Sequence, residues 1–511
     1  MPITTFAAID VGSYEVGMKI FELSKKYGLK EIDTVRYRLE LGKDVFESGR
    51  FSSKMIMELC TVLKNYKEIM DGYRVDSYRA YGTSPFRESK NAHIAIERVK
   101  QRTGVDISVL SNSEQRFLGY KSIAAQESGF QKMIRKSTAI VDVGGGGMQV
   151  SLFDKDALVT TQHLRLGSLR IRERLLALEK ETIHYEQLVE EFIHNELLTF
   201  KKLYLGDREV KHVIFLGDFF TDIIFHGESV ENTITREEFN RLYQDIISRS
   251  PEEMAMRLGI PVEYATLLVP TTVIYMNFVD IFKTEAMWVP GTTLADGIAY
   301  DYGEGCGLIK HKHNFENDIV VAAENIAYRY STSHRHTHAV AKIALKIFDS
   351  MKKVHGMGSR QRLLLHIAAI LHECGKYISM YAVADNSFHI IMSTEIIGLS
   401  HEERQIIASV VRYNSKEFGY YDEISREIGA NRESYQVIAM LTAIHRVANA
   451  LDRGHYQKIR DLHPVLKDGQ LTLALESERD FGLEQGLLQE KADFFEEVFG
   501  VQIRLRRKKQ V

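Results

Sequence analysis

Residues 138–153 read Thr-Ala-Ile-Val-Asp-Val-Gly-Gly-Gly-Gly-Met-Gln-Val-Ser-Leu-Phe, which is an apolar strand, a glycine-rich turn and a second strand. The same order opens the chain, where Phe6-Ala-Ala-Ile9 leads into Asp10-Val-Gly-Ser13. Glycine lets the backbone approach a ligand closely, so that successive N–H groups can converge on phosphate oxygens. Four consecutive glycines cost chain entropy where nothing requires them, which favours phosphate binding over two ordinary hairpin turns.

The residues around these loops predict a duplicated α/β fold. Val16 to Leu23 alternates apolar and polar residues with one slip, as a strand does, and 212–216 is a third apolar strand. We expect helices over 52–70 and 88–103, with a strand over 76–81 between them. Two strand–Asp-Val-Gly–strand units indicate two similar lobes with a cleft between them.

The chain divides further by composition. We assign lobe I to residues 1–125, lobe II to 126–300 and a glycine-rich linker to 301–316. Apolar residues at helical spacing predict an all-helical domain over 317–455. Residues 456–511 predict a small α+β cap with a strand over 471–475, a helix over 486–499 and a strand over 501–505. The cap ends in a basic tail, which is either solvated or in contact with anionic lipid or RNA.

Composition excludes several broad classes. Lys and Arg total 66 and Asp and Glu total 69, so the net charge of −3 gives no global field for nucleic acid or for a membrane surface. Cys60, Cys306 and Cys374 lie far apart, which indicates a reducing, cytoplasmic setting. No run reaches the roughly 18 apolar residues of a membrane span. We therefore expect no nucleic-acid partner and no membrane insertion.

Several motifs together resemble the Ppx/GppA family, the exopolyphosphatases and guanosine pentaphosphate phosphohydrolases of the actin-like superfamily. The matching segments are Asp10-Val-Gly-Ser13, Arg87-Glu88 with Asn91, Asp142-Val-Gly-Gly-Gly146, Leu166-Gly-Ser-Leu-Arg170 with Glu173, and Asp296-Gly297. The resemblance implies an actin-like (ribonuclease H-like) two-lobed α/β module, followed by an all-α HD-like domain and a small α+β segment. It also implies a homodimer.

The resemblance implies a phosphohydrolase site in the cleft. Water would remove the terminal phosphate of inorganic polyphosphate or guanosine pentaphosphate, with Mg²⁺ held at Asp142 and Asp10. The implied phosphate cradle consists of Asp10, Gly12, Ser13, Gly144, Gly145, Gly146 and Gly147. Arg87 would clamp phosphate oxygens. Alternatively, Arg87 forms a surface salt bridge with Glu88 or another neighbour.

The chain departs from the family pattern at the catalytic carboxylates. Gln115 and Gln149 stand where the family has Glu, and an amide cannot take up a proton near neutral pH. Glutamine can still orient a water molecule, and Glu114 is adjacent if the register shifts by one. On a strand or exposed turn, however, a neighbouring side chain points the other way.

Further departures affect phosphate binding. Tyr14 replaces an Asn and Gly17 replaces an Arg of the family's first loop. The third loop reads Gly217-Asp218-Phe219 instead of Gly-Gly-Thr, and Asp218 would repel phosphate unless it holds a metal.

The helical domain carries an eroded HD pattern. His336, His372 and Glu373 align with metal ligands of that pattern, whereas its final Asp aligns with Asn449. These residues either form a degenerate metal site or serve as helix-packing residues in a domain without its own catalysis. His334, His336 and His338 cannot all face one metal from a single helix.

Two functions remain open from the sequence. The first is a Mg²⁺-dependent phosphohydrolase, and the second is a polyphosphate- or nucleotide-binding regulator that has lost its catalytic base. A filament-forming actin-like protein is the third and weakest reading, because no filament-specific feature is visible.

Overall fold

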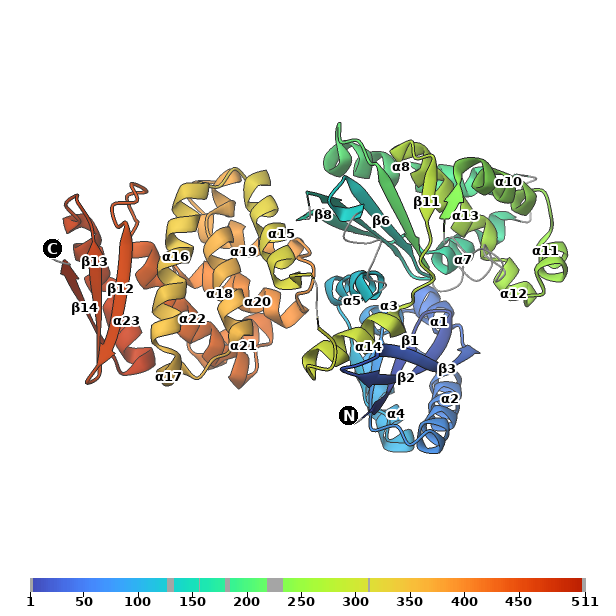
Figure 1. Ribbon diagram of the computed structural model, residues 1–511, viewed down its shortest axis with the longest axis horizontal. Helices are drawn as coiled ribbons and strands as arrows, with labels where there is room; N and C mark the ends of the chain where they lie inside the picture. The colour runs from blue at the N-terminus through green and yellow to red at the C-terminus, as the bar shows by residue number, and fades with distance from the viewer. Residues whose placement is uncertain are drawn as a thin grey trace. The chain divides into compact units, whose positions relative to one another are not determined.

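The computed structural model describes residues 3–125, 133–155, 157–179, 184–217, 233–310 and 313–507 (Figure 1). The chain forms two compact units, Met1–Asn314 and Phe315–Val511. Each unit has its own buried apolar core.

The first unit contains two lobes of strands and helices. Lobe I contains β1 (Thr4–Val11), β2 (Glu15–Ser24), β3 (Gly28–Arg38), α1 (Leu41–Ser48), α2 (Ser53–Gly72), β4 (Ser77–Gly82), α3 (Ser84–Glu88), α4 (Ala92–Thr103), β5 (Ile107–Val109) and α5 (Asn112–Ala125). Lobe II contains β6 (Thr138–Val143), β7 (Met148–Asp154), β8 (Ala157–Leu164), α7 (Ser168–Glu179), α8 (Tyr185–Phe200) with a π-helical turn (Lys201–Leu205), β9 (His212–Leu216), β10 (Thr233–Thr235), α10 (Arg236–Ile247), α11 (Pro251–Leu258), α12 (Val262–Ala265), α13 (Leu268–Phe282) and β11 (Ala286–Trp288). Helix α14 (Leu294–Gly305) follows.

The two lobes share the order of five of their strands, and lobe II has a sixth strand, β10, at one edge. Figure 1 labels β1 in lobe I and β6 in lobe II. The strand order is β3-β2-β1-β4-β5 in lobe I and β10-β11-β9-β6-β7-β8 in lobe II. In each sheet the strand that ends in Asp-Val-Gly pairs antiparallel with the next strand and parallel with a later one. The duplication predicted from the two loops is therefore present in the strand pairing.

The predicted hairpin at the start of the chain is confirmed by the antiparallel pairing of β1 with β2. The slip in its alternation arises because both faces of β2 are buried: Ile20 packs in one apolar cluster with Val16 and Met18, and Phe21 packs in another with Leu23. The β2–β3 register shift lies on β3, where Ile32 is the extra residue of a bulge.

Helix α14 packs against lobe I, although the chain reaches it from lobe II. Ile298 joins a buried apolar cluster with Phe6 and Leu118 of lobe I. The sequence assigned residues up to 300 to lobe II and began the linker at 301. In the structure, α14 continues to Gly305 and its buried face packs on lobe I. The apolar face of the helix decides where it packs, whereas chain order does not.

Gly297 allows α14 to cross α5 at close range. A Cβ atom at this position would lie 2.0 Å from the carbonyl oxygen of Leu118. Beside it, the Lys19 ammonium contacts the Asp296 carboxylate at 3.0 Å. The Asp296-Gly297 pair thus fixes the helix on lobe I.

The second unit is helical and ends in a small sheet. Its helices are α15 (Phe315–Arg329), α16 (His334–Ser350), α17 (Lys352–His355), α18 (Ser359–Leu371), the 3₁₀ turn η2 (Cys374–Tyr377), α19 (Val383–Ser393), α20 (His401–Tyr413), α21 (Tyr421–Ile428) and α22 (Arg432–Ala450). They are followed by β12 (Asp461–Lys467), β13 (Gln470–Glu476), α23 (Gly482–Phe499) and β14 (Gln502–Arg507). The helical block and the α+β end agree with the prediction, whereas β12 was missed.

Part of the basic tail forms a strand. Arg506 and Arg507 belong to β14, which pairs in parallel with β13, and residues 508–511 lie outside the described residues.

One stretch, Val262–Phe282, is long and apolar enough by mean hydropathy to cross a membrane, although polar residues interrupt its apolar run. Two thirds of its most apolar 18-residue window is buried, and Phe278, Val279 and Phe282 belong to the core cluster of lobe II. Burial of this kind is typical of the central helix of a folded domain.

Candidate functional site

A polar pocket lies where the two Asp-Val-Gly loops meet. Its lining consists mainly of glycines, hydroxyl groups and a few charged side chains. The lining residues are Asp10, Gly12, Ser13, Tyr14, Glu15, Thr83, Ser84, Arg87, Gln115, Val143, Gly144, Gly145, Gly146, Gly147, Gln149, His163, Ser168, Leu267 and Thr271. The structure thus brings together every residue predicted to bind phosphate, along with Arg87 and both amides. Glu114 and Asp142 are not among the lining residues.

Close approach of the two loops explains the glycine run. A Cβ atom at Gly145 would lie 2.7 Å from the Ser13 hydroxyl oxygen, and one at Gly146 would lie 2.2 Å from that of Ser84. Any side chain at these positions would push the second Asp-Val-Gly loop (loop 2, residues 142–147) away from lobe I, which carries the first (loop 1, residues 10–13). The glycines are therefore required by tertiary packing as well as by the shape of the turn.

Arg87 is held inside the pocket by lobe I. Its Nη1 donates hydrogen bonds to the Leu110 carbonyl oxygen at 2.8 Å and to Gln115 Oε1 at 3.1 Å. Burial lowers the pKa of Arg87 to about 10, against the opposing effect of nearby carboxylates, so the guanidinium stays charged at neutral pH.

The alternative salt bridge between Arg87 and Glu88 is not formed in the described part of the chain. Glu88 pairs instead with Arg170 of lobe II at 2.5 Å, and Arg170 Nε donates to the Gly146 carbonyl oxygen at 2.8 Å. The Glu88–Arg170 pair therefore connects the lobes beside loop 2 and leaves Arg87 facing the pocket.

Glu114 has a structural role. The segment around it was expected to be a strand or turn, but Asn112 begins helix α5. The Glu114 carboxylate accepts a hydrogen bond from the Ser111 backbone N–H at 2.9 Å, and Ser111 Oγ accepts one from the Glu114 N–H at 3.2 Å. This reciprocal pair is a capping box, which holds the carboxylate at the helix start.

Gln149 and Asp142 lie directly opposite each other in the β6–β7 hairpin. Directly opposed residues share one face of a sheet, so the two side chains are neighbours. Gln149 Oε1 is buried, and no group in the described residues hydrogen-bonds to it. Asp142 Oδ2 faces helix α5, 3.9 Å from where a Cβ of Gly119 would stand.

Sequence reasoning missed two titratable residues of the pocket. Glu15 follows loop 1 directly, and its carboxylate accepts a hydrogen bond from the Tyr264 hydroxyl at 2.9 Å. His163 lies on β8, and burial together with Arg116 and Arg87 lowers its pKa to about 3. Glu15 could have been noticed as an acid next to the loop, but no local pattern marks His163.

Two further departures from the family pattern concern single loop residues. Tyr14 is buried and packs edge-on against the Tyr264 ring, with centroids 5.1 Å apart. Asp218 of the third loop lies outside the described residues.

In the second unit, the predicted histidines do come together. His336, His372 and Glu373 are all buried, and His336 Nε2 lies 3.2 Å from His372 Nε2. His334 and His338 stack on each other instead, as expected for residues that a helix turns away from His336. The acid beside His336 is Asp452 at 2.9 Å, and the sequence had placed the corresponding position at Asn449.

Comparison with known proteins gives consistent matches along the chain. The family model described as the Ppx/GppA phosphatase family matches residues 22–304, and the model described as Ppx/GppA phosphatase, domain III, matches residues 320–494. A guanosine-5'-triphosphate,3'-diphosphate pyrophosphatase of Photobacterium profundum is 20% identical over 412 residues, covering 80% of each chain. One from Vibrio atlanticus is 20% identical over 430 residues with the same coverage.

Solved structures agree with this fold. An exopolyphosphatase from Cytophaga hutchinsonii has a TM-score of 0.51 at 19% identity, covering 59% of this chain and 98% of its own. That likeness supports the actin-like fold of the first unit. Because the family model alone spans more than half of the chain, the protein belongs to the Ppx/GppA phosphatase family.

Proposed function

We propose that this protein binds the terminal phosphates of inorganic polyphosphate or of guanosine pentaphosphate in the interlobe pocket and releases phosphate by attack of water. The observation that carries the proposal is the position of Arg87. A desolvated guanidinium faces a pocket made of two glycine loops and the hydroxyls of Ser13 and Ser84. Such a set of donors suits phosphate oxygens and offers little to an apolar ligand.

The pocket also fits Mg²⁺. This ion prefers one or two carboxylates together with water and substrate phosphate, and Asp10 and Glu15 supply carboxylates at the lining. Asp142, which the resemblance assigns to the metal, stands behind the lining toward α5. We therefore propose Asp10 and Glu15 as the holding residues. Bound Mg²⁺ would neutralise charge on the phosphate oxygens.

The chain's own residues would then position phosphate and water. The loop N–H groups and Arg87 hold the terminal phosphate, and Arg87 fixes the Gln115 amide by its oxygen. The Gln115 amide nitrogen is then the group left to donate a hydrogen bond to phosphate or water. Gln115 can orient a nucleophile in this way but cannot accept its proton.

The second candidate is a catalytically impaired regulator that binds the same ligands. A specific observation favours it: both expected carboxylates are amides, and the capping box occupies Glu114. Loss of a general base costs about 10²–10⁴ in rate. A protein of this kind would keep its phosphate loops and respond to the ligand without turning it over.

One experiment separates the two candidates. Phosphate release from polyphosphate and from guanosine pentaphosphate is measured with Mg²⁺ for the natural protein and for a Gln115→Glu, Gln149→Glu double variant. Turnover by the natural protein supports the phosphohydrolase. A silent natural protein with an active variant, or ligand-dependent thermal stabilisation without turnover, supports the regulator. If the natural protein shows no turnover and no ligand-dependent stabilisation, and the double variant is also silent, both candidate functions are contradicted.

Three broader expectations also remain proposals. We propose an HD-like fold for the helical unit, supported by its match to domain III and by the meeting of His336, His372 and Glu373. A homodimer and a cytoplasmic location follow from the resemblance and from the spacing of the cysteines. Sedimentation of the purified protein tests the homodimer, and fractionation of cells tests the cytoplasmic location.

A further inference from the structure

A small cavity adjoins the phosphate pocket on the side of strands β2 and β3. It shares two lining residues with the pocket, the acids Asp10 and Glu15. Arg87 lines the pocket, and Arg36 of β3 lines the cavity. Each of the two spaces therefore offers a guanidinium beside the same pair of acids.

Strand register places Arg36 on the same face of the sheet as Asp10. Strands β1, β2 and β3 are neighbours in lobe I (Figure 1), and Asp10, Gly17 and Arg36 lie opposite one another across them. Directly opposed residues share one face of a sheet. Neighbouring strands lie about 4.8 Å apart, so the Cα atom of Arg36 is about 10 Å from that of Asp10. Because Asp10 begins loop 1, this row of residues leads to the phosphate pocket.

The side chain of Arg36 is turned toward loop 1. Its Nε lies 3.9 Å from Glu15 Oε1, and about a third of the side chain is exposed. Glu15 is two residues nearer to loop 1 than Gly17, the residue that faces Arg36 across the strands. Gly17 leaves the space above the sheet open, since a Cβ atom there would meet no heavy atom within 4 Å.

The other cation that lines the cavity is balanced by two acids. Lys19 Nζ lies 2.9 Å from Glu31 Oε2 and 3.0 Å from Asp296 Oδ2. These contacts tie Lys19 to β3 and to the start of α14. Among the residues lining the cavity, Arg36 is thus the cation that faces Glu15 and the pocket.

The charges of the pocket favour a second cation for a chain of phosphates. Among the described residues that line the pocket, Arg87 is the one arginine or lysine, against two acids. His163 is uncharged at neutral pH because burial lowers its pKa to about 3. Each further phosphate of a chain adds negative charge next to Asp10 and Glu15, and like charges repel at such short range. A guanidinium opposes this repulsion and suits phosphate oxygens through its planar fork.

We propose that Arg36 binds a second phosphate of a linear phosphate chain while Arg87 and the glycine loops hold the terminal one. The proposal rests on the proposed function, because it extends the same site. Arg36 would reach from β3 into the space that a long side chain at position 17 would fill from β2. The predicted ligand is therefore a chain of consecutive phosphates and not a single phosphate group.

The test compares one phosphate with a chain of three. Imidotriphosphate, whose nitrogen bridges resist hydrolysis, is titrated into the full-length protein by calorimetry at constant free Mg²⁺, and orthophosphate is measured by competition. Arg36→Gln is expected to weaken imidotriphosphate binding about tenfold, through loss of a charge-assisted hydrogen bond, and to leave orthophosphate binding within about twofold. Arg38→Gln is the matched control, because Arg38 shares this face of β3 but pairs with Glu263 at 2.8 Å. It should bind both ligands as the natural protein does.

A second-site variant tests the geometry. Gly17→Arg, added to Arg36→Gln, returns an arginine to the same row from one strand closer, where space is open. We expect the double variant to recover most of the lost affinity for imidotriphosphate. A double variant that binds no tighter than Arg36→Gln would overturn the proposal.

The remaining outcomes separate this proposal from the proposed function. If Arg36→Gln binds imidotriphosphate like the natural protein, Arg36 has no such role and the proposed function still stands. Equal losses in Arg36→Gln and Arg38→Gln would also overturn the role of Arg36, because long-range charge would explain both. A natural protein that binds neither ligand would contradict the proposed function and this proposal together. Arg36→Lys, which loses the fork but keeps the charge, should show a smaller loss and decides if Arg36→Gln fails to fold.

Discussion

The guanidinium of Arg87 donates a hydrogen bond to the side-chain oxygen of Gln115 at 3.1 Å, across the start of helix α5. The two residues are 28 positions apart, and each lines the pocket between the glycine loops. The pair places a fixed positive charge and an oriented amide at the position where the terminal phosphate is proposed to bind.

Replacing Arg87 with Lys tests this arrangement. Lysine keeps the charge but loses the planar fork that contacts Gln115 and Leu110 and that is proposed to hold phosphate as well. Loss of charge-assisted hydrogen bonds worth about 1.5–3 kcal/mol predicts affinity for short-chain polyphosphate about 10- to 100-fold lower, measured by calorimetry. Arg79→Lys, whose partner is Asp301 outside the pocket, serves as the control and should bind normally. Equal affinities for the two variants would contradict the role of Arg87.

The opposed pair Asp142 and Gln149 predicts a response to Mg²⁺. The Gln149→Glu variant places two carboxylates side by side, and their repulsion should cost about 1–2 kcal/mol of folding free energy. Millimolar Mg²⁺ should restore part of this loss, so thermal unfolding of the variant should shift more on adding Mg²⁺ than that of the natural protein. Gln162→Glu on β8 provides a control with the same charge change. If Mg²⁺ stabilises both variants equally, no cation site lies near residue 149.

Glu114 should matter for stability and not for chemistry. The Glu114→Gln change weakens the reciprocal hydrogen bonds with Ser111, and we expect a loss of about 0.5–1 kcal/mol in unfolding free energy. Phosphate release, if the natural protein shows any, should stay within about twofold. An activity loss of the size expected for a catalytic base, about 10²–10⁴, would show that Glu114 leaves its cap during turnover.

Helix α14 gives a prediction about packing. Gly297→Ala would place a methyl group 2.0 Å from the Leu118 carbonyl oxygen, and overpacking of this kind costs about 1–3 kcal/mol. Gly305→Ala, at the other end of α14, meets no atom within 4 Å and should be neutral or slightly stabilising. Denaturant titration of both variants checks the difference. Equal stability would mean that α14 does not cross α5 at this distance.

The buried His163 predicts loss of stability in acid. Its pKa is about 3 in the folded protein and near 6.5 when unfolded, so the unfolded chain takes up the proton first. The stability contribution is therefore complete above about pH 6.5 and is lost as pH falls toward 3. His163→Leu should reduce the drop in stability between pH 7 and pH 4.5 by about 1–3 kcal/mol, measured by thermal unfolding. Identical pH profiles would show that His163 is solvated.

The sequence determined the elements that local patterns encode. The two Asp-Val-Gly loops, their hairpins and the run of helices after residue 314 follow from apolar periodicity and from glycine, which act over a few residues. The same loops were enough to predict the duplication and the glycine-rich part of the pocket lining. Each of these features is written within one short segment.

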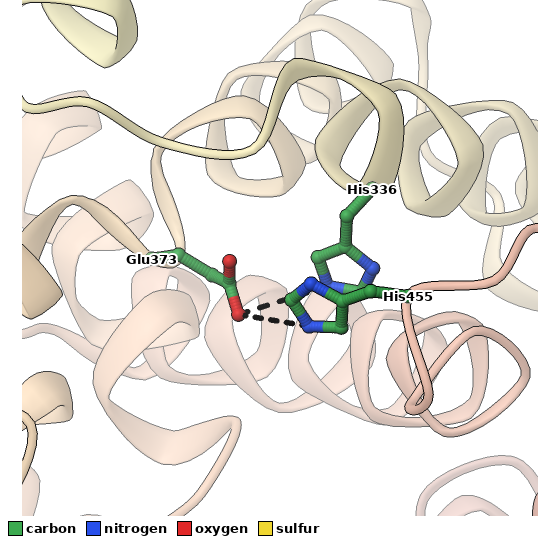
Figure 2. Close-up of side chains that lie close together, drawn as sticks. All are labelled: His336, Glu373 and His455. Carbon is green, nitrogen blue, oxygen red and sulfur yellow. Dashed lines mark ion pairs between the residues drawn. The ribbon is translucent and has the colours of Figure 1, made fainter.

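Tertiary structure alone decided the features that join distant segments. It placed α14 on lobe I, gave Glu114 to a helix cap, and brought Glu15 and His163 into the pocket. It also showed that the acid beside His336 is Asp452 and not the residue at position 449, and that His455 lies next to His336 and Glu373 (Figure 2). Such contacts depend on which faces of helices and strands pack together, and a chain read one segment at a time carries no record of that packing.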